Sequence, residues 1–137
     1  MAKRTIILRL TINDPVPGVC YSLQGKDGEP IDAATATEAP LSLNAPVVLN
    51  DDNRLSGPFV RREGTERRFV YIGIGKHAGA PDSNWDRRAK IDVHDIPADL
   101  LEVARQGRTL EVRLPGRAKD GSPACATVRP LKPWKAL

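Results

Sequence analysis

At 137 residues, with 40% hydrophobic and 28% charged side chains, the chain has the length and composition of one soluble globular domain, residues 1–137. No apolar run approaches the roughly 18 residues of a membrane span, and the N-terminus lacks the continuous apolar run of a secretory signal, so we expect a cytoplasmic protein without membrane association. The net charge is +4, and eight basic and four acidic residues between Phe59 and Lys90 account for all of it, which indicates either an anionic partner for this segment or a hairpin whose charges are simply solvated.

The first half of the chain is predicted to consist of short strands. Thr5–Ile12 alternates apolar and polar residues and predicts a half-buried strand. The turn at Asn13–Gly18 separates it from a second alternating run, Val19–Gln24, so the two runs predict a hairpin. Residues 25–39 show little periodicity and predict a loop. Leu41–Leu49 predicts a third strand, which Pro46 makes either an edge strand or an interrupted one.

The middle of the chain contains a second hairpin signal. Phe59–Arg61 and Arg67–Ile74 flank a Gly-containing turn and predict paired strands. Phe69 and Tyr71 share one face of the second strand, while apolar residues also occupy the other face, which indicates a central, covered position. Arg88–Val93 alternates again and predicts a strand with a charged outer face.

One helix is predicted, near residues 96–106. Asp95 or a neighbour is expected to cap it, and Gly107 is expected to end it in a left-handed conformation. Its expected apolar stripe consists of Ile96, Leu100, Val103 and Ala104.

Two further strands are predicted after the helix, at Leu110–Leu114 and Ala124–Leu131. The tail that follows either frays or docks Trp134. About seven short strands and one helix predict an α+β, mostly β, domain: a partly closed barrel or a sandwich with the helix packed against it.

The two cysteines, Cys20 and Cys125, form neither a disulfide framework nor a CxxC metal pair. In the cytoplasm they are expected to be reduced. Both lie in apolar, strand-like surroundings, which predicts inert, buried thiols.

The segment Gly73–Gly79, GIGKHAG, does not match a phosphate-binding loop. Its third glycine is one position late for the dinucleotide pattern and no helix is predicted after it, while Lys76 lacks the Ser or Thr that follows the lysine of a P-loop. His77 is a candidate general base with Asp82 or Asp86 as its partner, although the default interpretation of the pattern is a loop histidine without chemistry. We expect no metal and no cofactor.

The segment Trp85-Asp86-Arg87-Arg88 combines an aromatic stacking surface with the planar guanidinium groups that bind carboxylates and phosphates. Alternatively, Asp86 pairs with an arginine and Trp85 anchors the core. The predicted ligand-binding residues are His77, Trp85, Asp86, Arg87, Arg88 and Lys90. Aromatic residues make up only 4% of the chain, so we do not expect a nucleic-acid partner.

Three blocks of the sequence, in the same order, carry a resemblance to a known family: PGVCYSLQGKDGE, FVYIGIGKHAGAPDSNWDRRAKIDV and GSPACATVRPL. They resemble the domain of unknown function 5990 family, small uncharacterised bacterial proteins, over nearly the whole chain. Asn84 stands where a cysteine often precedes the tryptophan in that family, so no thiol role is carried over to this position. The resemblance implies a single-domain cytoplasmic bacterial protein and implies no activity, substrate or catalytic residue.

Three functions are open from the sequence. The first is a β-rich module that binds a small anionic ligand or an acidic protein partner through the basic, Trp-containing loop. The second is a small enzyme with a His/Asp site at His77. The third is a homodimeric interaction protein whose central segment forms the interface.

Overall fold

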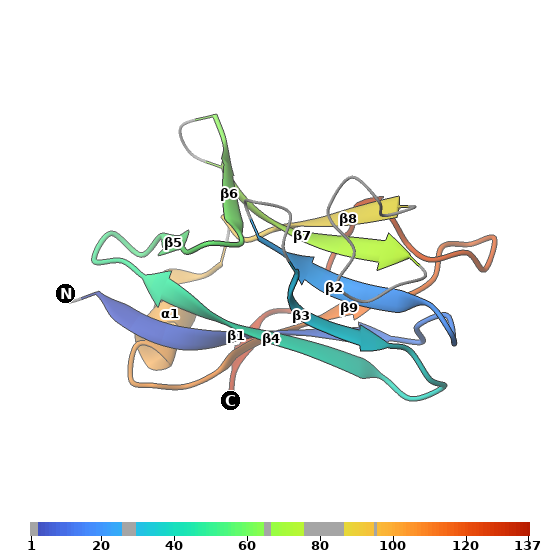
Figure 1. Ribbon diagram of the computed structural model, residues 1–137. Helices are drawn as coiled ribbons and strands as arrows, with labels where there is room; N and C mark the ends of the chain where they lie inside the picture. Colours follow the sequence, from blue (N-terminus) through green and yellow to red (C-terminus); the bar gives the residue numbers. More distant parts are fainter. Residues whose placement is uncertain (1–2, 26–29, 65–66, 76–86, 95) are drawn as a thin grey trace.

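A computed structural model describes residues 3–25, 30–64, 67–75, 87–94 and 96–137. These residues form eleven strands and one helix (Figure 1). The elements are β1 (Arg4–Asn13), β2 (Cys20–Gln24), β3 (Pro30–Thr35), β4 (Leu41–Leu49), β5 (Leu55–Ser56), β6 (Val60–Glu63), β7 (Arg67–Gly75), β8 (Arg87–Asp92), α1 (Ala98–Ala104), β9 (Leu110–Pro115), β10 (Ala126–Thr127) and β11 (Lys135–Ala136).

The five-stranded sheet has the order β11-β9-β1-β4-β5, with β1 at its centre. β1 pairs antiparallel with β4, Leu10 opposite Leu43, and parallel with β9, Leu10 opposite Val112. The alternating apolar residues of β1 are buried, as the sequence predicts, because one face of the sheet covers the core. β4 runs without interruption through Pro46, which lies opposite Ile7.

The six-stranded sheet has the order β10-β8-β7-β2-β3, and β6 also pairs with β7. β7 lies between β2 and β8: Ile72 is opposite Leu23 on one side and Ala89 on the other. The predicted central position of this strand and the predicted β6–β7 hairpin are therefore confirmed. Val70, Ile72 and Ile74 are buried against the other sheet.

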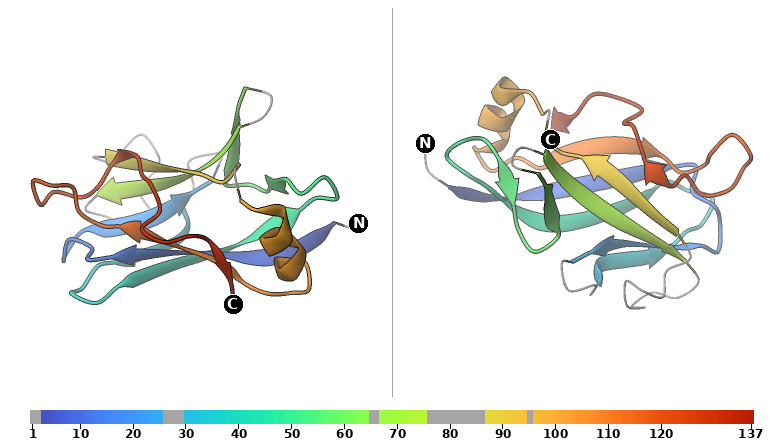
Figure 2. Two further views of the ribbon diagram at one scale, coloured as in Figure 1. Left: turned by 180° about the vertical axis from the view of Figure 1, so that it is seen from behind. Right: turned by 90° about the horizontal axis from the view of Figure 1, so that it is seen from above.

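The two sheets pack face to face, and their strands cross at an angle when viewed from above (Figure 2). Their facing side chains form one core, from Ile6 and Leu8 of β1 to Val70 and Ile91 of β7 and β8. Where β3 approaches β4, Asp32 Oδ2 accepts a hydrogen bond of 2.7 Å from the Asn44 backbone N–H, which links the two sheets along one side. The predicted fold class, α+β and mostly β with one helix, is confirmed.

The predicted hairpin between the first two strands is wrong. β1 and β2 lie in different sheets, and the turn between them carries the chain from one sheet to the other. In this turn Gly18 has φ +83°, and its N–H bonds to the Ala36 carbonyl at 3.0 Å. Local alternation identifies strands but not their partners, and β1 instead pairs along nine residues of β4.

The predicted loop at residues 25–39 contains β3, which pairs with β2 through Tyr21 and Ala34. β3 is the edge strand of its sheet, and its alanines and Asp32 are only partly buried. An edge strand covers little core, so its sequence does not need the apolar alternation that identifies a buried strand.

The predicted helical stripe is wrong at Val103, which is 42% exposed, whereas Leu101 is buried together with Ala104. The α-helix is only seven residues long, so its core contacts are the buried pair Leu101 and Ala104 and the partly buried Leu100 rather than a stripe over several turns. No side-chain hydrogen bond caps the helix at Pro97, and Asp95 lies outside the described residues. Gly107 has φ +93°, which confirms the predicted helix stop.

The C-terminal region differs from the predicted strand at Ala124–Leu131. Only Ala126–Thr127 pairs there, parallel to β8, and the tail adds β11 on β9. Trp134 is docked and packs against the core. Cys20 is buried, and burial raises the pKa of its thiol, but Cys125 is exposed because its segment pairs for only two residues. The prediction of a buried thiol is therefore wrong for Cys125.

Candidate functional site

Three of the six sequence-predicted ligand residues fall in a segment that the structure does not describe. His77, Trp85 and Asp86 lie outside the described residues, as does Asp82, a proposed partner of His77. For Arg87 and Arg88 the backbone is described: both belong to β8, opposite Ile74 and Gly73 of β7. Lys90 is the one predicted residue whose side chain is described.

Lys90 lies on the outer face of the six-stranded sheet, where it contacts Glu63 of β6. Its Nζ donates to both carboxylate oxygens of Glu63, at 3.0 Å to Oε1 and 2.7 Å to Oε2. The Tyr71 hydroxyl donates to the same Oε1 at 2.6 Å. The ammonium group also lies 4.1 Å from the centroid of the Phe69 ring, a cation–π distance.

These contacts set the protonation states of all three groups. The hydrogen bonds from Lys90 and Tyr71 lower the pKa of Glu63, and the bond to Glu63 raises the pKa of Lys90. Burial, followed by the bond to Glu63, raises the pKa of Tyr71. At neutral pH Lys90 is therefore a paired cation rather than a nucleophile or base, and its contact with Glu63 holds β6, β7 and β8 together.

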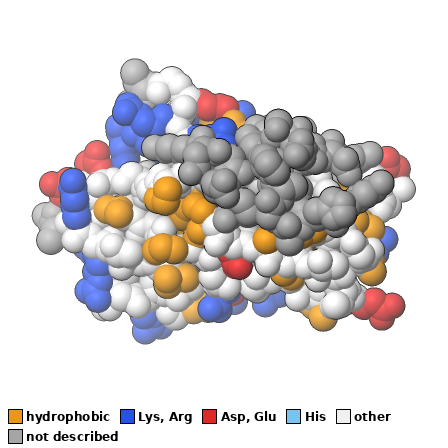
Figure 3. Space-filling model, viewed as in Figure 1, with side chains coloured by type: hydrophobic (Ala, Val, Ile, Leu, Met, Phe, Trp, Pro, Cys, Tyr) orange, Lys and Arg blue, Asp and Glu red, His pale blue; other side chains and the backbone are white. Residues whose placement is uncertain are grey.

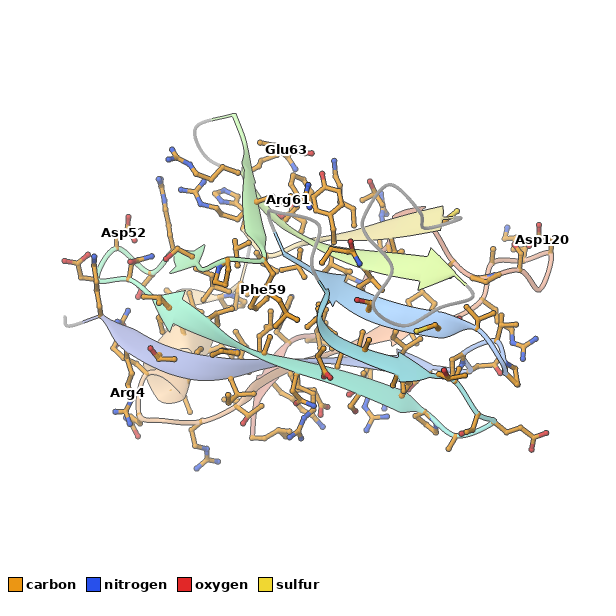
Figure 4. All side chains as sticks on the ribbon, in the orientation of Figure 1. Arg4, Asp52, Phe59, Arg61, Glu63 and Asp120 are labelled. Atoms are coloured by element: carbon orange, nitrogen blue, oxygen red, sulfur yellow. The ribbon has the colours of Figure 1, made fainter. Side chains whose placement is uncertain are left out.

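A pocket of about 220 Å³ opens beside this hairpin, between β5, β6, β7 and the turn before β5. We call it the arginine pocket, because three arginines contribute to its wall. Its lining residues are Asn50, Asp52, Arg54, Leu55, Ser56, Val60, Arg62 and Arg68. Basic side chains gather next to the β6 hairpin on the surface (Figure 3), and Figure 4 shows Asp52 in the turn beside β5.

Two of the three arginines are brought together by strand register. Arg62 of β6 lies directly opposite Arg68 of β7, so both side chains project from the same face of the hairpin. Arg68 is 8% exposed, and its Nη1 donates to the Arg67 carbonyl at 3.2 Å. Arg62 is exposed, and the structure gives it neither a hydrogen bond nor an ion pair with the described residues.

The third arginine comes from a tightly bonded turn. Asn53 has φ +65°, and the Arg54 N–H donates to Asp52 Oδ1 at 3.1 Å. Asn50 Nδ2 donates to the Arg54 carbonyl at 2.8 Å and to Ser56 Oγ at 3.0 Å. These bonds fix the backbone of the pocket rim, so the pocket is largely preformed.

Other kinds of site receive no support from the described part of the chain. No group of three or more His, Cys, Asp or Glu side chains is placed there to hold a metal ion. The pocket between the two sheets, lined by residues such as Tyr21, Ile72 and Leu114, has a volume of about 10 Å³, hardly room for one water molecule. In the described residues no helix has the length and apolar character needed to cross a membrane.

Sequence reasoning missed the arginine pocket. Arg62 and Arg68 belong to the basic excess between Phe59 and Lys90, but the sequence pattern predicts the ligand at the Trp-containing loop. The predicted hairpin could have revealed the Arg62–Arg68 pair, because the turn length sets which residues face each other. Arg54 could not be found this way, since it reaches the pocket through the β4–β5 pairing.

Comparison with known proteins gives a family but no activity. Neither the curated proteins nor the solved structures contain a match to this chain. A family model, described as a family of unknown function (DUF5990), matches residues 6–137, which is nearly the whole chain and agrees with the resemblance seen in the three sequence blocks. The chain therefore belongs to the DUF5990 family, a family of unknown function.

Proposed function

We propose that this protein is a binding module for a small oxyanion, such as phosphate or a phosphate monoester, and that the arginine pocket holds the anion. The observation that carries the proposal is the directly opposed pair Arg62 and Arg68, with Arg54 on the same pocket wall. An anion between these side chains would accept charge-assisted hydrogen bonds from guanidinium groups on two neighbouring strands.

The chemistry of the pocket suits an oxyanion better than a neutral ligand. The three arginines are opposed by one acidic lining residue, Asp52, whose Oδ1 already accepts the Arg54 backbone N–H. Guanidinium groups are planar, always charged and weakly hydrated, so they bind phosphate oxygens with paired hydrogen bonds. Asn50 and Ser56 line the same pocket and add side-chain groups that hydrogen-bond to oxygen.

The Trp-containing loop, with His77, Trp85, Asp86, Arg87 and Arg88, stays a prediction as a second anion site or a surface for an acidic partner. The enzyme at His77 and the homodimer also stay predictions. The arginine pocket is supported by its three arginines, by the register that places Arg62 opposite Arg68, and by its hydrogen-bonded rim. The proposed ligand is a small anion, as the charge of the central segment predicts. The proposed binding site is the arginine pocket instead of the Trp-containing loop.

Calorimetric titration with inorganic phosphate and phenyl phosphate at low salt tests the proposal. Arg62→Ala removes an exposed guanidinium without disturbing a described contact, and we expect it to weaken binding about tenfold, because a charge-assisted hydrogen bond contributes roughly 1.5–3 kcal/mol. Arg129→Ala is the matched control: Arg129 is also exposed, lies outside the pocket, and should leave the affinity unchanged.

Arg88→Ala separates the two possible places of binding. If the arginine pocket holds the anion, Arg88→Ala retains the phosphate affinity of wild type, while Arg62→Ala loses affinity. Added salt weakens phosphate binding to wild type and to Arg88→Ala alike. Equal affinity in wild type and Arg62→Ala, or no binding of either phosphate compound, would show that the proposal is wrong.

A further inference from the structure

Residues 131–137 form an arch over β9, and backbone hydrogen bonds hold both ends of the arch. At one end the Leu131 N–H donates to the Arg113 carbonyl at 2.8 Å. At the other, Thr109 and Leu137 exchange two backbone hydrogen bonds of 3.2 and 2.7 Å. Between these ties β11 pairs with β9, with Lys135 opposite Glu111. The arch is therefore an ordered part of the five-stranded sheet.

A pocket of about 270 Å³ lies between this arch and the outer face of β9. We call it the tail pocket; its lining residues are Glu111, Arg113, Lys132, Pro133, Trp134 and Lys135. Its volume is close to the lower end of the range for small-molecule sites, about 300 Å³. Trp134 packs against the core and also lines the pocket, so the indole is held in place while part of it faces the space where a ligand would sit.

Glu111 gives the tail pocket an unusual polar group. The residue is 5% exposed, and its Oε1 is buried without a hydrogen-bond donor. Three cations surround the carboxylate at ion-pair distances: Lys135 Nζ at 3.5 Å and Arg113 Nε at 3.6 Å from Oε1, and Arg9 Nη1 at 3.9 Å from Oε2. These three cations compensate the buried carboxylate, and their summed positive charge exceeds its single negative charge.

The charges around the pocket favour an anionic ligand that also has a flat ring. Arg113, Lys132 and Lys135 line the pocket against the single carboxylate of Glu111, and Arg9 adds a further positive charge next to it. An inorganic anion would leave the indole of Trp134 unused. A neutral ring, in contrast, would leave the excess cations without a partner.

We propose that the tail pocket binds a nucleoside monophosphate. The base stacks on Trp134, as bases do on aromatic side chains that bind single-stranded nucleic acids, and the phosphate lies among Lys132, Arg113 and Lys135. The indole and the cations that line the pocket recognise a flat ring and a phosphate rather than one particular base, so we expect GMP and AMP to bind alike.

Calorimetric titration of the full chain with GMP, AMP, guanosine and ribose 5-phosphate tests this inference. GMP and AMP should bind with similar affinity, and guanosine and ribose 5-phosphate should each bind about tenfold more weakly than GMP, since stacking and phosphate contacts each contribute on the order of 1–3 kcal/mol. Trp134→Leu and Lys132→Ala should each weaken GMP binding about tenfold, while Trp134→Phe, which keeps a stacking ring, should retain most of it.

Lys119→Ala is the matched control for Lys132→Ala, because both lysines are exposed and Lys119 lies outside the pocket. Lys132→Ala also keeps the test valid if Trp134→Leu fails to fold. Unchanged GMP affinity in Lys132→Ala, or no binding of GMP at millimolar concentration, overturns the inference. If Arg62→Ala rather than Lys132→Ala abolishes GMP binding, the nucleotide occupies the arginine pocket: the inference then fails while the proposed oxyanion function stands.

Discussion

At the scale of single residues, Glu63 connects three strands through one carboxylate. It comes from β6, and it accepts hydrogen bonds from Tyr71 of β7 and Lys90 of β8. Next to it, Arg67 Nη1 bonds to Asp92 Oδ2 at 3.1 Å, and the Arg61 guanidinium lies 4.9 Å from the Tyr71 ring centroid. These contacts hold the β6–β7 hairpin on the sheet that carries the arginine pocket.

The lowered pKa of Glu63 predicts a dependence of stability on pH. Its ordinary value is 4.5, and the hydrogen bonds from Lys90 and Tyr71 lower it in the folded protein. Its contribution to stability is thus complete above pH 4.5 and is lost as the pH falls through the lower, folded value. We expect Glu63→Gln to lower the midpoint of thermal unfolding at neutral pH. On acidification, the midpoint of this variant should fall less than that of wild type.

Thermal unfolding of wild type, Glu63→Gln and Glu38→Gln across acidic and neutral pH measures this effect. Glu38 is exposed, and no hydrogen bond or ion pair involves it in the described part of the chain, so its substitution should leave the curve unchanged. If wild type and Glu63→Gln lose stability in parallel on acidification, the carboxylate does not have the role that its contacts indicate.

At the scale of elements, β1 stabilises the five-stranded sheet and faces two environments. It pairs with β4 on one side and β9 on the other, and its even-numbered apolar residues enter the core. Leu10 is fully buried, whereas Ile7 on the opposite face is 40% exposed. The same strand therefore offers a buried and an exposed apolar residue for comparison.

We expect Leu10→Ala to lower the free energy of unfolding by about 3 kcal/mol, because it removes buried contacts and leaves a cavity. Ile7→Ala, on the exposed face of β1, should cost less than about 1 kcal/mol. Urea unfolding followed by circular dichroism gives both values. Similar costs for the two substitutions would contradict the assignment of the two faces of β1.

The elements also show what a sequence can and cannot predict. β1, β7 and β9 were predictable because their own residues alternate over a whole strand. β5, β10 and β11 have two residues each, too few for a period, and they exist only because a distant strand accepts them. The partner of β1 was mispredicted for the same reason: pairing depends on contacts between distant segments, which local patterns do not encode.

At the scale of the whole molecule, the pockets that the described residues form are larger at the surface than between the two packed sheets. The pocket between the sheets is about 10 Å³, whereas the arginine pocket and the tail pocket are about 220 and 270 Å³. The basic excess of the central segment predicted an anionic ligand from the sequence. Its place could not be predicted, because the pocket joins Arg54 to Arg62 and Arg68 through the pairing of β5 with β4 and of β6 with β7.

Crystals soaked in tungstate, a heavy analogue of phosphate, test the oxyanion site most directly. The account predicts an anomalous peak in the arginine pocket, within hydrogen-bond distance of the guanidinium groups of Arg62 and Arg68. A pocket without a peak, with tungstate bound only elsewhere on the molecule, would contradict the account.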